Sequence, residues 1–98
     1  MLRIAFTAPL ERWSVRADSW FFVHLPEAES DEIAALPLPP AGFGAVKVRA
    51  SVGAQRWETS VFPDAARGCY SLPVKKAIRV REGLDEGEPV RVELEVIG

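Results

Sequence analysis

Hydrophobic and polar residues alternate in several stretches of the chain, and this period of two predicts mainly β structure. The clearest stretches are residues 46–52 (VKVRASV) and 90–96 (VRVELEV), and residues 2–8 (LRIAFTA) follow the same period. Residues 20–25 (WFFVHL) are rich in aromatic and β-branched side chains, which favour strands. Because both faces of this last stretch are largely apolar, we expect a central strand covered on both sides, with Trp20 in the core.

Prolines, glycines and polar residues divide these strands. Proline cannot donate a hydrogen bond to a sheet, so Pro9 should end the first strand or lie at a sheet edge. The polar residues 11–19 are compatible with either a second strand or a loop. Residues 53–55 (GAQ) predict a short turn, which joins 46–52 to a partner strand at 56–62 in a hairpin.

Two short helices are predicted between the strands. In the first, the Ser30 hydroxyl offers an N-cap, and Asp31 and Glu32 place negative charge in the first turn, where the helix dipole favours it. Pro37 should stop this helix within about two turns. Residues 37–44 (PLPPAGFG) then read as an ordered connector, because their prolines restrict the backbone to extended conformations.

The second helix is predicted in the last third of the chain. A loop at residues 63–68 and a strand containing Tyr70 and Leu72 precede it. Pro73 should open the helix, since a first helical position needs no N–H, and Gly83 should end it. The residues expected to face inward are Val74, Ala77 and Ile78.

The two halves of the chain resemble each other. In each half a Leu-Pro step, at residues 25–26 and 72–73, follows an aromatic-containing strand and leads into a short helix. Residues 46–52 and 90–96 are the alternating strands that follow. We therefore predict a mainly β fold: a small closed or double-split β-barrel with pseudo-twofold symmetry, two strand–helix–strand units and two short capping helices.

Composition places the chain among soluble globular domains. Its 98 residues are enough for one domain, spanning 1–98, and 48% of them are hydrophobic. Twelve Lys and Arg against fourteen Asp and Glu leave a net charge of −2, which gives no general attraction to nucleic acid or anionic membranes. Nucleic acid thus becomes an improbable partner, although clustered cations keep that hypothesis open.

The chain has few residues that bind metals or form disulfides. Its single cysteine, Cys69, has no partner for an internal disulfide, and one histidine cannot complete a Cys/His set for zinc. The first residues, MLRIAFTAPLERW, lack the long apolar core of a signal peptide or membrane span. We therefore expect a cytoplasmic, soluble protein with no metal, no cofactor and no membrane partner.

Five sequence blocks occur in order along the chain: Trp20-x-x-Val23-x-Leu25-Pro26, GAVKV at 44–48, TSVFP at 59–63, LPVKKAIR at 72–79 and Gly83-x-x-x-Gly87-Glu88-x-Val90. Together they resemble the bacterial and archaeal family called domain of unknown function 1905 (DUF1905). The resemblance covers nearly the whole chain and implies a small β-barrel. It implies no activity, because none is established for the family.

A second resemblance concerns the last third alone. Residues 72–92 are similar to the swapped-hairpin unit of AbrB and MazE-type transcription factors, in which two chains each contribute one unit to a DNA-binding barrel. Here one chain would supply both units. This likeness concerns packing, and it implies architecture more than DNA binding.

A cluster of cations on the second helix is the first candidate site. It comprises Lys75, Lys76, Arg79 and Arg81, with Arg67 as a possible addition. These side chains would hold a phosphate or another anion, helped by the helix N-terminus near Pro73. The simpler interpretation, which we favour, is a solvated helix face whose late cations complement the helix dipole.

Aromatic residues are the second candidate. Trp20, Trp57, Phe62 and Tyr70 would line a small-molecule pocket or stack on bases. Trp20 and Phe62 are better explained as core, because aromatic burial dominates in a domain of this size. Trp57 and Tyr70 have polar neighbours, and both interpretations stay open for them.

Catalytic chemistry finds little support in the sequence. His24 lies in the middle of a strand with no neighbouring Ser, Cys or acid, so we interpret it as structural. Cys69 would be nucleophilic only if Arg67 lowered its pKa, and we interpret it as a small strand residue. Ser60 and Ser71 lack a Gly-x-Ser-x-Gly context.

These observations lead to a hypothesis of a non-enzymatic β-barrel module that binds a small anionic ligand or a protein partner. Its ligand would contact the basic helix at residues 73–81 and the nearby aromatic residues. The candidate residues are Trp57, Arg67, Tyr70, Lys75, Lys76 and Arg79. The alternative hypothesis is AbrB-like DNA binding through the same helix. The sequence identifies no catalytic residue and no metal ligand.

Overall fold

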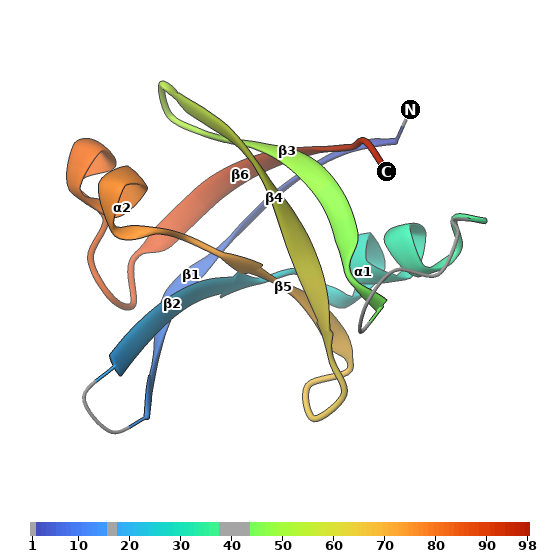
Figure 1. Ribbon diagram of the computed structural model, residues 1–98, viewed down its shortest axis with the longest axis horizontal. Coiled ribbons are helices and arrows are strands. Elements are labelled where there is room, and N and C mark those ends of the chain that lie inside the picture. The colour runs from blue at the N-terminus through green and yellow to red at the C-terminus, as the bar shows by residue number, and fades with distance from the viewer. Residues whose placement is uncertain (1, 16–17, 38–43) are drawn as a thin grey trace.

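The computed structural model shows a closed, six-stranded, antiparallel β-barrel with one helix at each end (Figure 1). It describes residues 2–15, 18–37 and 44–98. The predicted mainly β fold and the closed barrel are thus confirmed. The elements are β1 (Arg3–Val15), β2 (Asp18–His24), α1 (Glu27–Ala34), β3 (Val46–Val52), β4 (Gln55–Asp64), β5 (Cys69–Pro73), α2 (Lys76–Glu82) and β6 (Pro89–Val96).

The first strand, β1, is longer than predicted because it belongs to both halves of the barrel. Its first part, up to Pro9, pairs with β6, and from Leu10 onward it pairs with β2. Pro9 lies opposite Pro89, where the pairing changes, so its missing N–H interrupts no continuous ladder. The adjacent corner is closed by Leu10, whose N–H donates to the Glu88 carbonyl at 2.9 Å. The prediction that Pro9 ends the strand was therefore wrong, and residues 11–15 continue it.

The order of strands around the barrel is β1-β2-β5-β4-β3-β6. Exchanging β1 with β4, β2 with β5 and β3 with β6 leaves every strand with equivalent neighbours. This is the pattern expected of the internal repeat, and α1 and α2 occupy equivalent places at opposite ends (Figure 1). If residues 25–26 are aligned with 72–73, His24 becomes the counterpart of Ser71, and these two residues face each other where β2 pairs with β5.

The core fills the barrel with aliphatic side chains from alternate strand positions. Strands β3 and β6 confirm the predicted period, since every second residue of each is buried. The buried hydrophobic residues are Ile4, Phe6, Leu10, Val23, Leu25, Ile33, Val46, Val48, Ala50, Val52, Val61, Leu72, Val74, Ile78, Val90, Val92, Leu94 and Val96. The β3–β4 hairpin and the strand containing Tyr70 and Leu72 are also confirmed.

Helix α1 begins earlier than predicted. Pro26 occupies the N-cap position, and the acids of the first turn are Glu27 and Glu29. Ser30 is therefore not a cap: it lies inside the helix, buried, and its Oγ accepts a hydrogen bond from the Tyr70 backbone N–H at 3.0 Å. The Ser30 hydroxyl joins α1 to β5 instead of satisfying its own helix. The connector that follows Pro37 lies mostly outside the described residues.

Helix α2 begins later than predicted. Pro73 is the last residue of β5 and pairs with Phe22, so it does not open the helix, which starts at Lys76. Val74 and Ile78 are buried as expected, whereas Ala77 is exposed. Gly83 ends the helix in the left-handed conformation (φ 61°), as predicted.

The aromatic strand β2 is not covered on both sides. Val23 is buried inside the barrel, but the alternate residues point outward, and Trp20 is 55% exposed. Phe62 on β4 is likewise 42% exposed. The prediction that Trp20 and Phe62 belong to the core was therefore wrong. In a closed barrel a strand has an inner and an outer face, and an apolar outer face is left at the surface.

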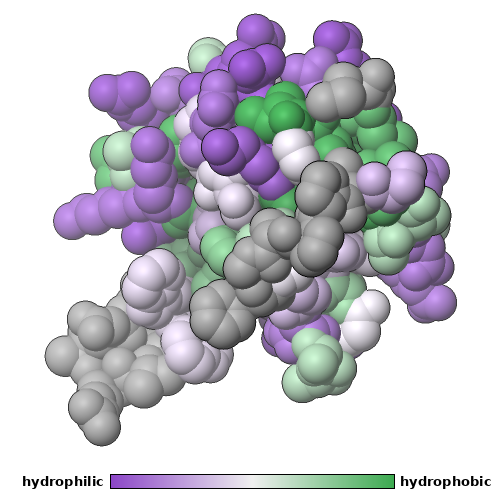
Figure 2. Space-filling view, turned by 45° about the vertical axis from the view of Figure 1, so that its right-hand side comes forward, coloured by the Kyte–Doolittle hydropathy of each residue, from purple (hydrophilic) through white to green (hydrophobic). Residues whose placement is uncertain are grey.

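Polar side chains cover much of the face shown in Figure 2, and hydrophobic ones form small groups among them. Among the described residues, no helix is long and apolar enough to cross a membrane.

Candidate functional site

The six predicted site residues do not meet in one place. Lys75 and Lys76 are exposed at the start of α2. Arg79 instead packs α2 onto the barrel: its guanidinium carbon lies 3.8 Å from the centre of the Phe21 ring, and its Nε donates to the Val74 carbonyl at 3.3 Å. The cation–π contact and the hydrogen bond give Arg79 a structural task that the charge pattern did not reveal.

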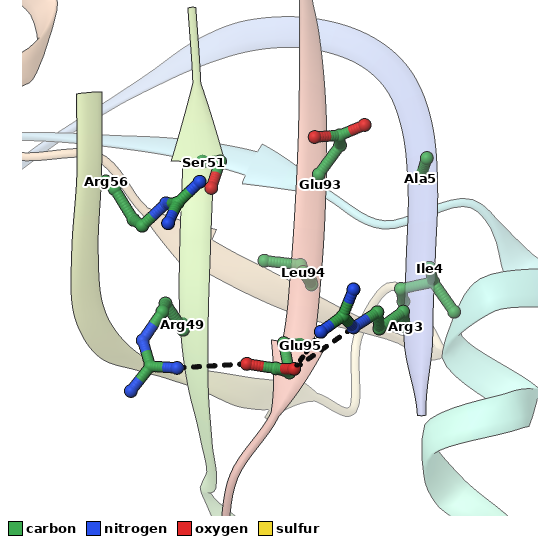
Figure 3. A pocket seen from close by; sticks show the side chains of 9 residues that line it. All are labelled: Arg3, Ile4, Ala5, Arg49, Ser51, Arg56, Glu93, Leu94 and Glu95. Carbon is green, nitrogen blue, oxygen red and sulfur yellow. Dashed lines mark hydrogen bonds and ion pairs between the residues drawn. The ribbon is translucent and has the colours of Figure 1, made fainter. Parts of the chain in front are cut away.

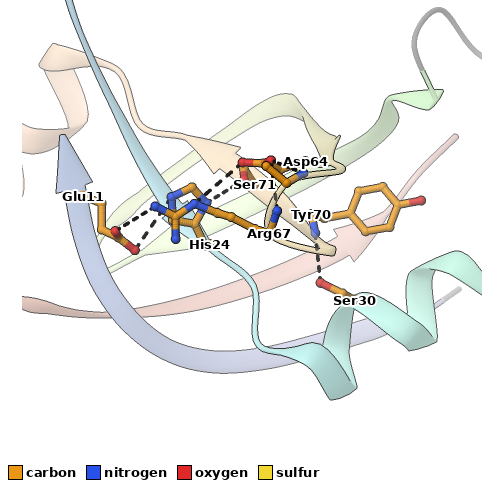
Figure 4. A network of polar contacts seen from close by, with 8 residues as sticks. Glu11, His24, Ser30, Asp64, Arg67, Tyr70 and Ser71 are labelled. Carbon is orange, nitrogen blue, oxygen red and sulfur yellow. Dashed lines mark hydrogen bonds and ion pairs between the residues drawn. The ribbon is translucent and has the colours of Figure 1, made fainter. Parts of the chain in front are cut away.

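The two aromatic candidates lie partly buried against the core, on different elements. Trp57 is on β4, on the same face as Gln55, which bonds Glu82 of α2. Tyr70 is on β5, next to α1, and its ring points away from the nearby polar network (Figure 4). Only Arg67, in the turn before β5, lines either of the two surface pockets described below.

The pocket that includes Arg67 lies on the outer face of β1, β2, β5 and β4. Its volume is about 380 Å³, within the range of small-molecule sites. Its apolar wall is formed by Trp13, Phe22, Phe62 and Pro63. Its polar residues are Glu11, Arg12, His24, Asp64, Arg67 and Ser71. We call this the outer-face pocket.

A continuous polar network forms one side of the outer-face pocket (Figure 4). His24 Nδ1 lies 2.6 Å from Ser71 Oγ, and His24 Nε2 lies 3.7 Å from Glu11 Oε2. Arg67 lies between two carboxylates: its Nη2 is 3.3 Å from Glu11 Oε1, and its Nε is 3.7 Å from Asp64 Oδ2. The Asp64 carboxylate also accepts the backbone N–H groups of Ala66 and Arg67, which holds the turn in place.

The electrostatics of this network keep His24 neutral at pH 7. Burial lowers the pKa of His24 below its ordinary 6.5, and the nearby Arg67 cation lowers it further. Glu11 and Asp64 act in the opposite direction but do not reverse the shift. The neutral ring stacks on Phe22, with centroids 6.2 Å apart. We place the ring proton on Nε2, facing Glu11, so that Nδ1 accepts the Ser71 hydroxyl.

This network contains the residue types of a Ser-His-acid triad, but its geometry is different. In a triad the nucleophile bonds Nε2 and the acid bonds Nδ1, whereas here Ser71 is on Nδ1 and Glu11 on Nε2. Ser71 is also only 5% exposed, and its Oγ is engaged with His24 Nδ1. We therefore give the network no nucleophilic role. Its arrangement is suited to orienting His24 and Arg67 along the wall of a pocket.

Cys69 adds no nucleophile to this site. Burial raises the pKa of its thiol above the ordinary value, the Asp64 carboxylate raises it further, and the opposing effect of Arg67 is smaller. The thiol therefore stays protonated at neutral pH, which agrees with its interpretation as a small strand residue. Among the described residues, no group of three or more His, Cys, Asp or Glu side chains could hold a metal ion.

A second pocket, of about 470 Å³, lies on the outer face of β1, β6, β3 and β4 (Figure 3). Glu95 on β6 bridges Arg3 and Arg49, each at 3.0 Å. Arg49 also pairs with Glu58 at 3.2 Å. Cross-strand ion pairs of this kind are typical of a solvated sheet surface and contribute little to stability.

Sequence analysis missed most of the outer-face pocket because its residues are far apart in the chain. Glu11 and Ser71 contact His24 from positions 13 residues before it and 47 after it. One signal was available: the internal repeat aligns His24 with Ser71, and a pseudo-twofold axis between β2 and β5 brings such counterparts together.

Comparison with known proteins adds a family and no function. A protein-family model described as "Domain of unknown function (DUF1905)" matches residues 6–94. No curated protein matches the chain.

Proposed function

Since the chain belongs to the DUF1905 family, whose description assigns no activity, we propose from its geometry that it is a non-enzymatic binding module for a small organic anion. The observation that carries this proposal is the outer-face pocket, in which the guanidinium of Arg67 stands beside an exposed apolar wall. Arg67 is the residue that we assign to the anion. It is the member of the predicted set that lines this pocket.

Arg67 is prepared for such a contact by its neighbours. Its side chain is 48% exposed, and its guanidinium pairs with Glu11 through Nη2 at 3.3 Å and with Asp64 through Nε at 3.7 Å. The remaining terminal nitrogen, Nη1, has no partner within the described part of the chain. A guanidinium that is already paired at two nitrogens has less freedom to lose when it binds an anion, and this supports binding.

The test is a titration of the protein with three small anions, benzoate, hexanoate and inorganic phosphate, followed by NMR. We expect at least one of them to bind, and Arg67→Gln to weaken that binding about tenfold or more, because a hydrogen bond to a charged group is lost. The matched control is Lys75→Ala with Lys76→Ala, which removes two exposed cations outside the pocket. Binding that is indifferent to Arg67→Gln contradicts the proposal.

The same control variant tests the basic helix as the anion site. Three exposed cations support that alternative, namely Lys75 and Lys76 at the start of α2 and Arg81 near its end. Arg79, by contrast, packs against the Phe21 ring in a cation–π contact. Arg79 is therefore left unchanged in the variant, because its removal would also loosen the helix. If α2 holds the anion, the Lys75→Ala, Lys76→Ala variant loses affinity and Arg67→Gln does not.

A protein partner is the other occupant that the outer face would suit. Trp and Arg are enriched at the centres of interfaces, and Trp13, Trp20 and Arg67 are all exposed. We favour the small anion because the site is concave and has a defined polar end.

AbrB-like DNA binding through α2 is the second candidate function. It is supported by the cations Lys75, Lys76 and Arg81 on one short helix, and opposed by the net charge of −2. It requires a salt-dependent mobility shift of duplex DNA that the Lys75→Ala, Lys76→Ala variant weakens. A duplex that runs unshifted at low salt removes this candidate.

A further inference from the structure

We infer that the anion bound in the outer-face pocket is an aromatic monocarboxylate. This inference rests on the proposed function and narrows it to one chemical class. Two features of the pocket carry it, namely the nature of its apolar wall and the charges around Arg67.

The apolar wall of the pocket is largely aromatic. Phe22 and Phe62 come from β2 and β4, and Trp13 from β1 is 56% exposed to solvent. Exposed rings at the surface of a barrel are unfavourable unless something covers them. An aromatic ring gains more from such a wall than a saturated ring of similar size, because ring pairs attract one another beyond simple burial.

The charges around Arg67 favour a single negative charge on the ligand. Glu11 and Asp64 each place a carboxylate oxygen within 3.7 Å of the guanidinium, so a doubly charged phosphate would meet two like charges. A carboxylate carries one charge and matches the planar fork of an arginine. His24 is neutral at pH 7, so the two cations of the pocket, Arg12 and Arg67, are matched in number by the carboxylates of Glu11 and Asp64, and no excess positive charge favours a dianion.

The pocket thus has an aromatic part and a polar end on neighbouring elements. The ligand carboxylate would face Arg67, and its ring would lie against Trp13, Phe22 and Phe62. Trp13 has a matched control on the adjacent strand: Trp20 lies directly opposite it, is 55% exposed, and is not among the residues of the pocket wall.

The experiment compares three ligands on the intact chain: benzoate, cyclohexanecarboxylate and benzamide. The first two share the carboxylate but differ in aromatic character, and benzamide keeps the ring without the charge. We expect benzoate to bind about two- to tenfold more tightly than cyclohexanecarboxylate, the range that a ring–ring contact contributes. Benzamide should bind at least about tenfold more weakly than benzoate, and phosphate should not compete with benzoate.

Two tryptophan variants test whether the preference for benzoate over cyclohexanecarboxylate arises in the outer-face pocket. Trp13→Leu keeps an apolar side chain and should reduce the advantage of benzoate over cyclohexanecarboxylate, since only Phe22 and Phe62 remain, whereas Trp20→Leu should preserve it in full. Equal binding of the two acids, with the dependence on Arg67 intact, overturns the aromatic inference and leaves the proposed function standing. Tight phosphate binding at Arg67 overturns the monocarboxylate in the same way. If Arg67→Gln leaves the affinity for benzoate unchanged, both the aromatic inference and the proposed function are overturned.

Discussion

His24 lies where the charged groups of the outer-face pocket meet. Its ring contacts Ser71 and Glu11 directly, and the charges of Arg67 in the β4–β5 turn and Asp64 at the end of β4 also act on it. Because burial and Arg67 lower its pKa, the folded protein holds this histidine neutral under conditions in which an unfolded chain would protonate it. The protonation of His24 therefore makes the stability of the folded protein depend on pH.

This linkage gives a prediction for stability. Between pH 6.5 and the lowered pKa of His24, the unfolded chain binds a proton that the folded protein does not, so the free energy of unfolding falls as the pH falls through this range. The contribution is fully present above pH 6.5. His24→Gln should remove this part of the pH dependence, as measured by urea denaturation of both proteins at a series of pH values.

Other groups titrate in both proteins, so the informative quantity is the difference between wild type and variant. If the two curves of stability against pH stay parallel from pH 7.5 down to pH 5, His24 has an ordinary pKa and the described environment is wrong.

Helix α2 contacts the β3–β4 hairpin through the side chain of Glu82. At Gly53, in the hairpin turn, an added Cβ atom would overlap Glu82 Oε1, and the backbone has φ +55°. The same Glu82 carboxylate accepts a hydrogen bond from Gln55 Nε2 at 3.1 Å. A side chain at residue 53 would therefore have to displace the Glu82 carboxylate from its contact with Gln55.

Gly53→Ala should therefore destabilise the protein in two ways. A left-handed alanine costs roughly 1–2 kcal/mol, and displacement of Glu82 loses a hydrogen bond worth about 1 kcal/mol. Gly68→Ala is the control, because Gly68 also has positive φ (70°) but open space around it, and it should show the first cost only. Chemical denaturation measures both variants.

A double variant separates the two costs. If Glu82 is the obstacle, adding Glu82→Ala to Gly53→Ala should cost less than Glu82→Ala alone in wild type. Equal effects of Gly53→Ala and Gly68→Ala would show that α2 does not rest on the hairpin in this way.

At the scale of the whole molecule, the barrel is built from two related halves that have diverged at their shared axis. The period of two in β3 and β6, the Leu-Pro steps and the internal repeat were sufficient to predict a closed barrel with two helices. These signals are either local in the chain or repeated within it, so they can be recognised in a single sequence. The divergence is seen at His24 and Ser71, counterparts that differ and hydrogen-bond each other.

The site was less predictable than the fold, for two physical reasons. Hydrophobicity does not distinguish the inner from the outer face of a strand that is apolar on both, so Trp20 was wrongly assigned to the core. Charge patterns do not reveal which cations take part in packing, so the sequence grouped Arg79 with Lys75 and Lys76 although Arg79 packs on Phe21. Only pairing between distant strands brings Glu11, His24 and Arg67 together.

One NMR measurement tests most directly whether the outer-face pocket is an anion site. The chain has a single histidine, so its imidazole signals report the pKa of His24 without ambiguity. We predict a pKa below 6.5 in the free protein and a higher value with saturating benzoate, because a bound anion favours the protonated ring. A pKa of 6.5 or above in the free protein, or one that benzoate leaves unchanged, would contradict the assignment of this pocket.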